Sequence, residues 1–510
     1  MFAWFENRLN PYPAAEPKQP PKTLFAFIIY YSRPALWWLV GMAVLTAAIG
    51  VGEVVMFNFL GQIVDWLSKS DPKTFLAKEG WTLFGMGLFA VIGLPGLVVL
   101  QALLIHQVLI GNYPMIGRWQ MHRYLLRQSM NFFANEFAGR VATKVMQTSL
   151  AVREVTMKVL DVFVYVASYF ISMFVIIGTA DWRLIGPLAL WLVLYCSLLR
   201  YFMRKVSEQQ ADARSMMTGR IVDSYTNIAT VKLFSHAGRE EAYARKGMDE
   251  FLVTVHGQMR YITMFQALVY SNNALLSLLT TTLSIWFWLN GSISLGVIAV
   301  AISLALRING MSQWIMWEVS ALFENIGTVY DGMAMLSKQQ DIRDADGAKA
   351  LAAPKGRIEF DRVHFHYGKS KGVISDISLA IQPGEKVGLV GRSGAGKTTL
   401  MNVLLRFYDI EGGQIRIDGQ DISRVTQDSL RSMIGVVTQD TSLLHRSIRD
   451  NIAYGKPGAT DAEIIEAARR ANAWEFIETL VDPNGRVGLD AQVGERGVKL
   501  SGGQRQRIAI

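Results

Sequence analysis

Residues 391–399 read Gly391-Arg392-Ser393-Gly394-Ala395-Gly396-Lys397-Thr398-Thr399 and fit the pattern G-x-x-x-x-G-K-[ST]. The glycines let backbone N–H groups turn toward a polyphosphate, Lys397 supplies a cation, and the Thr398 hydroxyl is placed to contact Mg²⁺. Average residue frequencies produce this pattern by chance in about 0.02 of chains of this length. An apolar stretch at 387–390 and a helical pattern at 400–407 predict strand, loop and helix, so the phosphate is expected at a helix N-terminus.

The composition indicates that much of the chain lies in a membrane. The chain has 510 residues, of which 51% are hydrophobic and 18% are charged, whereas soluble domains have about 25% charged residues. The single cysteine, Cys196, lies in an apolar run, so an intrachain disulfide is excluded and a buried, inert thiol is expected. Residues 1–21 contain acidic residues and several prolines instead of a secretory signal, and are interpreted as a partly disordered cytoplasmic leader.

Residues 22–322 are predicted to form a transmembrane domain. A short apolar stretch at 22–31 suits an interfacial helix. Six longer apolar stretches follow, each with at least the roughly 20 residues that a helix needs to cross a bilayer. These predicted spans are residues 34–64, 81–110, 159–180, 184–203, 262–289 and 295–322.

The positions of lysine and arginine predict the orientation of these spans. The long segments at 111–158 and 200–260 carry many of both residue types, so both are expected to be cytoplasmic, together with the N-terminus. This topology accounts for the net charge of +9 and argues against nucleic-acid binding. Both segments have helical patterns, and helices of this length reach roughly 30 Å from the membrane. They are interpreted as hairpins that contact a soluble domain, with solvated hairpins as the alternative.

The C-terminal part of the chain is predicted to be an α/β nucleotide-binding domain. A polar, alanine-rich linker at 323–355 precedes it, and the domain covers residues 356–510. Strands with an antiparallel edge are expected at 357–360, 377–381, 387–390, 414–417 and 434–437. Helices are expected after the phosphate loop and at 461–479. The predicted fold class is therefore a six-span helical membrane domain followed by an α/β P-loop NTPase domain.

A second motif specifies the family. Residues 500–504 read Leu500-Ser501-Gly502-Gly503-Gln504, about a hundred residues after the phosphate loop. With six spans and two cytoplasmic hairpins, this motif makes the chain resemble an ATP-binding-cassette exporter half-transporter. The resemblance implies that Ser501, Gly502, Gly503 and Gln504 face a nucleotide, ATP with Mg²⁺, bound to the opposite cassette. A chain with one loop and one signature would therefore work as a homodimer or with a similar chain.

The resemblance assigns roles to further positions. Tyr367 matches the aromatic residue that stacks on adenine, although a strand-end tyrosine remains the alternative. Gln439 matches the glutamine that contacts Mg²⁺ and the attacking water. Residues 493–497 resemble the cross-talk segment of exporters. Residues 132–144 are similar to the first cytoplasmic hairpin, and residues 227–234 to the second, where a short transverse helix rests on the partner's cassette.

Some charged residues lie inside predicted spans. Glu53, Asp161 and Arg307 are among them, and intramembrane charge is costly unless it faces a partner or a wet cavity. Glu53 and Arg307 are hypothesised to line a transport cavity, with a structural ion pair as an equally weighted alternative. Five apolar or aromatic residues of the spans are candidates for the wall of a substrate site: Met264, Phe265, Tyr270, Trp314 and Trp317. The commoner alternative for such residues is packing against lipid.

The family's next elements are an apolar strand ending in Asp-Glu and a later histidine loop. Both are expected beyond Ile510, so the sequence is interpreted as a C-terminally truncated record and no catalytic base is named. For the complete protein, we predict ATP hydrolysis that drives export of a small amphipathic or hydrophobic substrate. The expected location is the bacterial inner membrane, with the nucleotide-binding domain cytoplasmic. The alternatives are an ATP-gated channel, a sensor, or a non-functional fragment.

Overall fold

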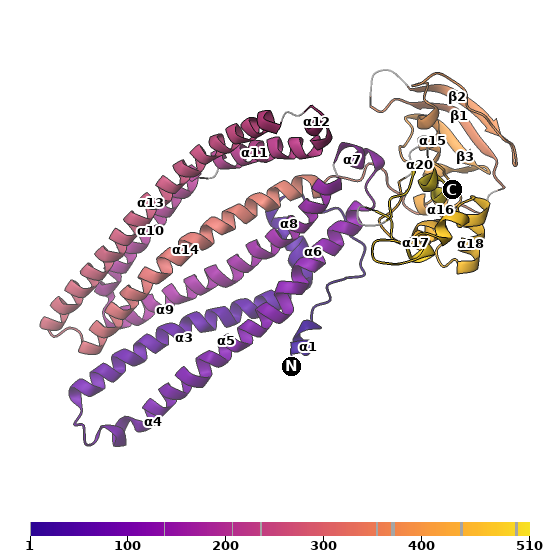
Figure 1. Ribbon diagram of the computed structural model, residues 1–510. Coiled ribbons are helices and arrows are strands. Elements are labelled where there is room, and N and C mark those ends of the chain that lie inside the picture. Colours follow the sequence, from indigo (N-terminus) through magenta and orange to yellow (C-terminus); the bar gives the residue numbers. More distant parts are fainter. Residues whose placement is uncertain are drawn as a thin grey trace. The chain divides into compact units, whose positions relative to one another are not determined.

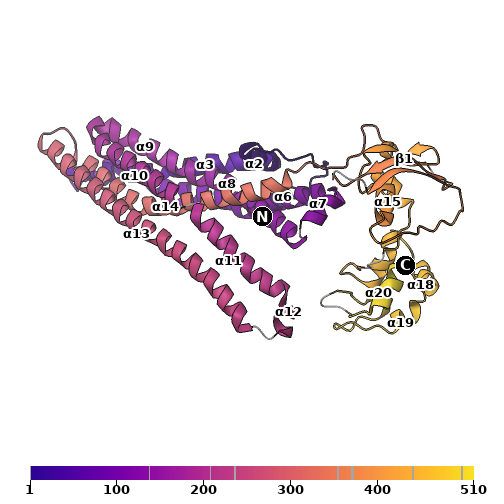
Figure 2. The ribbon, with the colours of Figure 1, turned by 90° about the horizontal axis from the view of Figure 1, so that it is seen from above.

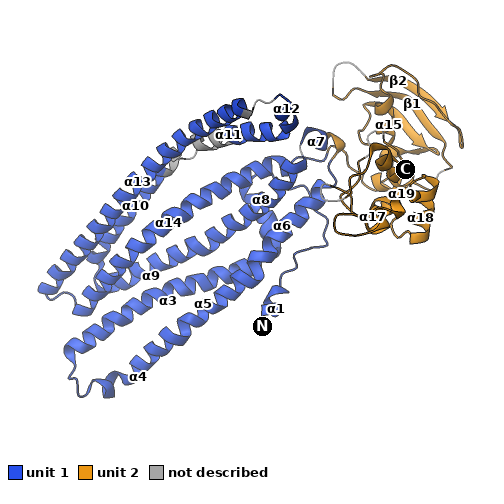
Figure 3. Cartoon of the chain, viewed as in Figure 1, with its two compact units in different colours: residues 1–128, 132–340 blue, residues 129–131, 341–510 orange. Residues whose placement is uncertain are grey.

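The computed structural model describes residues 2–136, 138–206, 208–234, 237–352, 355–368, 373–438, 442–494 and 498–510. The chain divides into two compact units (Figure 3). The first, called the membrane unit below, comprises residues 1–128 and 132–340. The second, called the nucleotide unit, comprises residues 129–131 and 341–510. Each unit is described by itself.

The membrane unit contains six helical segments long and apolar enough to cross a membrane, which confirms the predicted number of spans. Several of these segments also contain the helices of the two predicted hairpins, so they are longer than the predicted spans. The helices of the six segments (Figure 1) are, in order, α2 (Leu24–Ser32) and α3 (Leu36–Lys69); α4 (Phe75–Leu88), α5 (Leu94–Leu103) and α6 (Ile110–Leu125); α8 (Ala138–Met157) and α9 (Val164–Ala180); α10 (Ile185–Val206); α13 (Ala237–Leu289); and α14 (Leu295–Leu336).

Short π-helical segments join several of these helices. They lie at Phe89–Gly93 between α4 and α5, at Leu104–Leu109 between α5 and α6, and at Lys158–Phe163 between α8 and α9. A π turn holds an extra residue, so it changes which side chains face inward on either side of it. The third segment contains Asp161, one of the charged residues singled out in the sequence.

The first and sixth spans approach closely at two glycines. A Cβ atom added to Gly61 on α3 would lie 2.9 Å from the carbonyl oxygen of Gly296 on α14, and one added to Gly296 would lie 2.1 Å from that of Gly61. Small residues permit such close packing of membrane helices. Asp65 joins the same two helices, because it accepts hydrogen bonds from the Ser294 hydroxyl at 2.6 Å and the Gly296 N–H at 2.7 Å.

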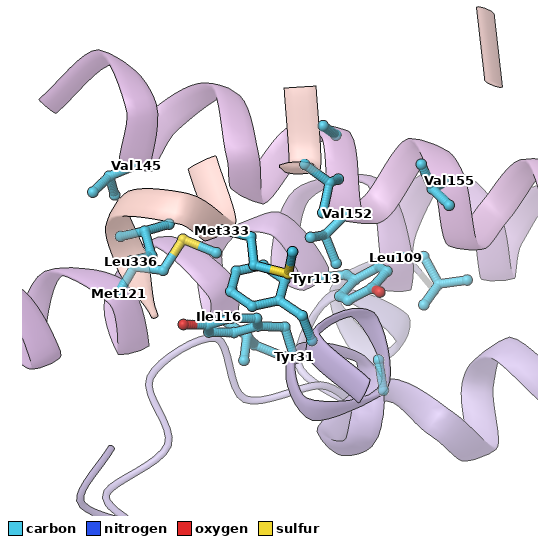
Figure 4. Close-up of a cluster of buried hydrophobic side chains, with 14 of the residues drawn as sticks. Tyr31, Leu109, Tyr113, Ile116, Met121, Val145, Val152, Val155, Met333 and Leu336 are labelled. Carbon is cyan, nitrogen blue, oxygen red and sulfur yellow. The ribbon is translucent and has the colours of Figure 1, made fainter. Parts of the chain in front are cut away.

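Two hydrophobic clusters stabilise the membrane unit. In the first, side chains of α2, α6, α8 and α14 converge (Figure 4). Met333 and Leu336, from the end of α14, are both buried there. The helix therefore extends well into residues 323–355, whose beginning was expected to be a polar linker. The second cluster joins α9, α10, α13 and α14 around Trp191 and Tyr195.

Both hairpins that the sequence predicts to be cytoplasmic are helical, as predicted. The first contains α6, α7 (Met130–Asn135) and α8, and the second contains α11 (Glu208–Thr226), α12 (Ile228–Leu233) and α13. Figures 1 and 2 show α12 at the tip of the second hairpin, beside the ends of α11 and α13. Apolar side chains remain exposed at this tip, including Leu233, which is 81% exposed.

The leader is ordered in the structure, so the expectation of partial disorder was wrong. It begins with α1 (Phe2–Glu6) and continues as an extended strap. The Trp119 indole and the Arg123 guanidinium on α6 both donate to the carbonyl of Pro13, each at 3.2 Å. The Ser337 hydroxyl donates to the carbonyl of Pro21 at 2.8 Å. These side-chain donors satisfy backbone carbonyls that have no secondary-structure partner, and so hold the strap in place.

Large apolar side chains cover much of the outer surface of the spans. Trp37 and Trp81, for example, are 83% and 86% exposed. Such a surface suits a helix bundle surrounded by lipid. Cys196 on α10 is also exposed, so the expectation of a buried thiol was wrong. The apolar run around Cys196 comes from a helix that has one face in the bundle and another outside it, with Tyr195 buried beside it.

The nucleotide unit contains a four-stranded antiparallel sheet. Its strands are β1 (Ile358–Phe365), β2 (Ile374–Ile381), β3 (Gly412–Ile417) and β4 (Gln420–Asp421), in the order β2-β1-β3-β4. Helix α15 (Lys397–Leu404) contributes Val403 and Leu404 to the core beneath the sheet. The predicted strands at 357–360, 377–381 and 414–417 are therefore confirmed, together with the antiparallel edge.

The predicted strands at 387–390 and 434–437 are not present as strands. Among the described residues they have no ladder partner, and most of their apolar side chains are exposed, Val390 by 99%, whereas Ile434 is half-buried against the sheet core. A parallel strand is stable only between neighbouring strands with both faces covered. Apolar content alone therefore does not produce a strand at these positions.

A second cluster of the nucleotide unit is helical. It brings together residues of α17 (Ile448–Ile452), α18 (Asp461–Arg470), α19 (Trp474–Glu478) and α20 (Gly502–Ala509). The predicted helix at 461–479 is present as two helices, because Asn472 between them has a φ of 51°, in the left-handed region. A further short helix, α16 (Gln427–Ser432), packs on the sheet core through Leu430.

Candidate functional site: a phosphate loop, a signature helix and a membrane cavity

The phosphate loop leads into α15 through two left-handed glycines. Gly394 and Gly396 have φ values of 82° and 89°. Gly396 is the residue before the helix, and no side chain caps its first turn. A Cβ atom at Gly396 would lie 3.0 Å from the carbonyl oxygen of Val373, so the position requires glycine for both its backbone conformation and its surroundings. The first amides of α15 are thus left for an anion to bind.

The cation of the motif lies over the loop. The Lys397 ammonium donates to the carbonyl of Gly391 at 2.7 Å and to that of Arg392 at 2.9 Å. Thr398 is exposed in the first turn of α15, whereas Thr399 is buried. The loop therefore brings together uncapped helix amides, the Lys397 ammonium and the exposed Thr398 hydroxyl. These groups suit a polyphosphate with its metal ion.

Tyr367 lies beside this loop. Its hydroxyl donates to Thr399 Oγ1 at 3.2 Å, and its ring packs edge-on against Phe365 and Tyr408, with centroids 4.6 and 4.9 Å apart. Burial, and to a smaller extent Tyr367, raise the pKa of the Tyr408 phenol above its ordinary value, so the Tyr408 phenol is neutral at physiological pH. Tyr367 is 39% exposed. It is both a strand-end tyrosine and a neighbour of the loop, and its stacking on adenine stays a prediction.

The signature motif begins a helix, α20. Ser501 precedes α20, and its hydroxyl accepts a hydrogen bond from the Gln504 N–H at 3.2 Å, while the Gln504 side-chain oxygen accepts one from the Ser501 N–H at 2.9 Å. This reciprocal pair is a capping box, which satisfies two of the backbone donors at the start of the helix. The amides of Gly502 and Gly503 are not used by it.

The loop and the signature belong to different hydrophobic clusters. Val403 and Leu404, just after the loop, pack in the sheet core. Leu500 and Ile508, which flank the signature, pack in the helical cluster of the same unit. Gln439 and residues 495–497 lie outside the described residues, so their predicted roles have no structural account. Val493, at the start of the predicted cross-talk segment, pairs with Val498.

The membrane unit holds a cavity of about 400 Å³. Its wall comes from α3, α5, the third π-helical segment, α9 and α14. The lining residues are Thr46, Ile49, Gln101, Asp161, Val162, Tyr165, Arg307, Gly310, Met311 and Trp314. Of the five predicted wall residues, only Trp314 lines it; Phe265 is buried elsewhere, and Met264, Tyr270 and Trp317 are exposed on the helices.

Glu53 and Arg307 form an ion pair next to this cavity. Arg307 Nη2 lies 2.9 Å from Glu53 Oε2, and the Tyr165 hydroxyl donates to the same carboxylate oxygen at 2.7 Å. Arg307 lines the cavity, whereas Glu53 is not among the lining residues. The sequence left two alternatives for this pair, a cavity lining and a structural ion pair. Both apply to Arg307, which is paired with Glu53 and also lines the cavity.

Asp161 is held by two neutral side chains that the sequence analysis did not single out. Its Oδ1 atom accepts from the Thr46 hydroxyl at 2.5 Å and from Gln101 Nε2 at 2.9 Å. Gln101 Nε2 also donates to Thr46 Oγ1 at 2.6 Å. A glutamine in the middle of an apolar span was the available signal, because such a side chain requires a polar partner in the membrane.

These features define the class of the protein. A helical membrane unit with six spans precedes a unit that carries a phosphate loop and a separate glycine-rich signature helix, so the protein is an integral membrane protein with an attached nucleotide-binding domain. Comparison with family models matches residues 39–312 to the ABC transporter transmembrane region and residues 374–510 to the ABC transporter domain. The chain belongs to the ABC transporter family, with the architecture of a half-transporter, and the predicted resemblance is confirmed.

Individual relatives agree with this assignment. An uncharacterised ABC transporter ATP-binding protein of Haemophilus influenzae is 51% identical over 518 residues, which cover 100% of this chain and 83% of that protein. ATP-binding cassette sub-family B member 6 of Xenopus tropicalis is 36% identical over 61% of this chain, but only 35% of that longer protein is covered. The structure of a bacterial Atm1-family ABC exporter with ATP bound has the same fold, with a TM-score of 0.78 and 24% identity, over 94% of this chain and 83% of that one.

Membership of this family implies ATP binding and supports ATP-driven export. The described residues fit a nucleotide, since the loop combines uncapped helix amides, the Lys397 ammonium and the exposed Thr398 hydroxyl.

Proposed function

We propose that the protein is an ATP-driven exporter that works as a dimer of half-transporters and moves a small amphipathic or hydrophobic substrate by alternating access. One observation carries the proposal. Each chain has one phosphate loop and one signature helix, and the two belong to separate hydrophobic clusters. A site that needs both elements at one phosphate is therefore best completed by a second chain, either a copy or a close relative.

The proposal assigns a role to each element of the nucleotide unit. The loop residues 391–399 bind the phosphates, with Lys397 contributing charge and Thr398, together with Gln439, contacting Mg²⁺. Tyr367 stacks on the adenine. The second chain's copies of Ser501, Gly502, Gly503 and Gln504 face the terminal phosphate. Hydrolysis of the bound ATP is part of this proposal, and no described residue is assigned as its general base.

The second cytoplasmic hairpin is proposed to transmit the movement of the nucleotide units to the spans. Helix α12 at its tip is short and carries exposed apolar side chains, including Ile228 at 45% and Leu233 at 81%. Exposed apolar surface at the end of a long helical hairpin suits a contact with another domain. The lysine and arginine residues of the hairpins favour the cytoplasm as their location. The similarity to a bacterial relative favours the bacterial inner membrane as the membrane.

Inside-out membrane vesicles provide the test, because export then appears as uptake. Vesicles containing the protein are incubated with a small-molecule extract of bacterial cells, with or without ATP and Mg²⁺, and their contents are compared by mass spectrometry. We expect one or more compounds to accumulate above the external concentration with ATP, and Lys397→Ala vesicles to lack this accumulation. An ATP-gated channel would bring compounds only to equal concentrations on both sides, so that outcome would replace export with the channel alternative.

A further inference from the structure

The ionisable residues around the membrane cavity include one carboxylate more than the cations that could pair with them. Arg307 is paired with Glu53, at 2.9 Å. One helical turn before Asp161, Lys158 is paired with Glu318 on α14. Each of these pairs is neutral overall. Within the described part of the chain, no lysine, arginine or histidine lies within ion-pair distance of Asp161. The cavity wall therefore carries one carboxylate that no protein cation compensates.

The hydrogen bonds of Asp161 orient its carboxylate without neutralising it. Both recorded donors, the Thr46 hydroxyl and the Gln101 amide, are directed at Oδ1. Both are neutral, and both donate to Oδ1, so neither brings a positive charge to the carboxyl group. The second oxygen, Oδ2, has no hydrogen bond among the described residues, and Asp161 is half-buried on the cavity wall. One oxygen is thus fixed by the helices while the other is left for a different partner.

The backbone contributes to this arrangement. Asp161 and Val162 lie in the π-helical segment Lys158–Phe163, where the extra residue of the wide turn changes the direction of the side chains relative to a regular helix. Thr46, on the facing span, is only 1% exposed, so the donor that holds Oδ1 is fixed by packing. The position of the carboxylate is set by three different spans and does not depend on one flexible rotamer.

Aromatic and apolar side chains form the rest of the wall near Asp161. Tyr165, one helical turn after Asp161, meets Trp314 edge to face, with centroids 5.9 Å apart and an interplanar angle of 82°. Ile49 and Met311 complete an apolar surface beside them. Aromatic faces attract organic cations, and the attraction increases where water is displaced. The same rings provide little for an anion.

We propose that this cavity binds an organic monocation, with its charged centre near Asp161 and its apolar groups against Tyr165, Trp314 and Met311. The inference rests on the proposed export function and narrows its substrate class from amphipathic compounds in general to cationic ones. A half-buried carboxylate without a counter-charge is unfavourable in a membrane, and a ligand that brings the missing positive charge is favoured over a neutral or anionic molecule of the same shape. A cavity of about 400 Å³ is within the size range of sites for drug-sized molecules.

A pair of ions with nearly the same shape and opposite charge tests the proposal. Tetraphenylphosphonium and tetraphenylborate are measured for equilibrium binding to the full chain in lipid nanodiscs without ATP, with empty nanodiscs to correct for partition into lipid. We expect the phosphonium to bind and the borate to bind at least 10-fold more weakly. In Asp161→Asn, which keeps the shape and removes the charge, phosphonium binding should fall about 10-fold.

Two further variants keep the result interpretable. Asp181→Asn removes a carboxylate at the end of the same helix, roughly 30 Å along it at 1.5 Å per residue, and should leave phosphonium binding unchanged. Arg307→Gln removes a positive charge from the cavity wall and leaves Glu53 without its cation, so phosphonium binding should increase several-fold, which no loss of folded protein produces. Equal binding of the two ions, unchanged binding in Asp161→Asn, or no increase in Arg307→Gln would overturn the proposal.

Because binding is measured without ATP, its outcome is separate from that of the vesicle experiment. Charge-selective binding without ATP-dependent uptake would retain the cation site and reject export. ATP-dependent uptake of a compound, with no preference for the phosphonium over the borate, would retain export and reject the cation site.

Discussion

The two glycine-rich stretches of the nucleotide unit both begin a helix, but they begin it in opposite ways. Helix α15 follows Gly396 in a left-handed conformation, with no side-chain cap. Helix α20 follows Ser501, whose side chain and that of Gln504 form a complete capping box. Unsatisfied amides at a helix start bind anions, and a cap uses part of that capacity. The phosphate loop is therefore built as a binding site in itself, whereas the signature helix is self-stabilised and offers fewer donors.

The largest difference between the two stretches should appear when the cation of the loop is removed. In Lys397→Ala, ATP loses a charge-assisted contact, which costs about 2 kcal/mol or roughly a 30-fold weaker affinity. Fluorescent ATP titrated into single chains in nanodiscs measures this loss. Lys386→Ala removes an exposed lysine just before the loop and serves as the matched control. A similar loss in both variants would mean that general charge, and not the position of Lys397, determines the affinity.

The uncapped start of α15 is tested next by Gly396→Ala. The new side chain meets the carbonyl of Val373 and has an unfavourable positive φ, at a cost of about 1–2 kcal/mol. ATP affinity should fall roughly 10-fold by the same titration. In Gly388→Ala, where no described residue lies within 4 Å of the added Cβ, the affinity should stay at the wild-type value. Equal affinities of both variants would show that the loop tolerates a different backbone conformation.

The capped helix should respond in stability but not in the nucleotide affinity of a single chain. Removing the hydroxyl in Ser501→Ala costs about 1 kcal/mol of helix stability. Faster amide hydrogen exchange across α20 would report this, and Ser501→Thr should restore wild-type exchange. ATP affinity, measured in nanodiscs that hold one chain each, should change by less than about twofold. A loss as large as that of Lys397→Ala would place the signature at the loop of its own chain.

The smallest expected effect is a loss of helix stability at low pH, and it distinguishes the capping boxes of α18 and α20. Helix α18 begins with Thr460 and Glu463, while α20 uses the non-ionising Gln504 in the same place. The hydrogen bond from Lys456, followed by those from Thr460, lowers the pKa of Glu463 to about 2 from 4.5. A depressed pKa gives stability that is present above pH 4.5 and lost as the pH falls toward 2. Hydrogen exchange at the start of α18, corrected for its intrinsic pH dependence, should therefore increase between pH 5 and pH 2.5.

Two controls accompany this measurement. Hydrogen exchange at the start of α20 should not increase over this pH range, and Glu463→Gln should remove the pH dependence at α18. Acid sensitivity of equal size in both helices would point to general unfolding of the nucleotide unit instead of titration of Glu463.

The sequence predicted the spans and hairpins well because their signals are long. A span needs some 20 apolar residues, so six of them are recognised without knowledge of any tertiary contact. The two motifs were also recognised, because glycine, lysine and serine at fixed spacings have direct local consequences, such as the left-handed Gly396 and the capping Ser501. The family assignment follows from both.

Features that depend on distant partners were not predicted. The strands expected at 387–390 and 434–437 need neighbours on both sides, which local patterns do not report. The Thr46–Gln101–Asp161 cluster joins three spans, and a single sequence contains no signal that pairs them. The exposure of Cys196 was missed for the same reason, since an apolar run is compatible with either face of a helix.

The N-terminal strap has a consequence for the order in which the protein is made. Gln19 donates to the carbonyl of Ser337 at 3.1 Å, across 318 residues of sequence. The strap leaves the ribosome before the six spans, yet the end of α14 is synthesised only after all of them. At about 5–20 residues per second, the wait is roughly 16–64 s. During biogenesis the early spans must therefore remain in the membrane without the contact between Gln19 and Ser337. This contact can form only after the membrane unit has been synthesised.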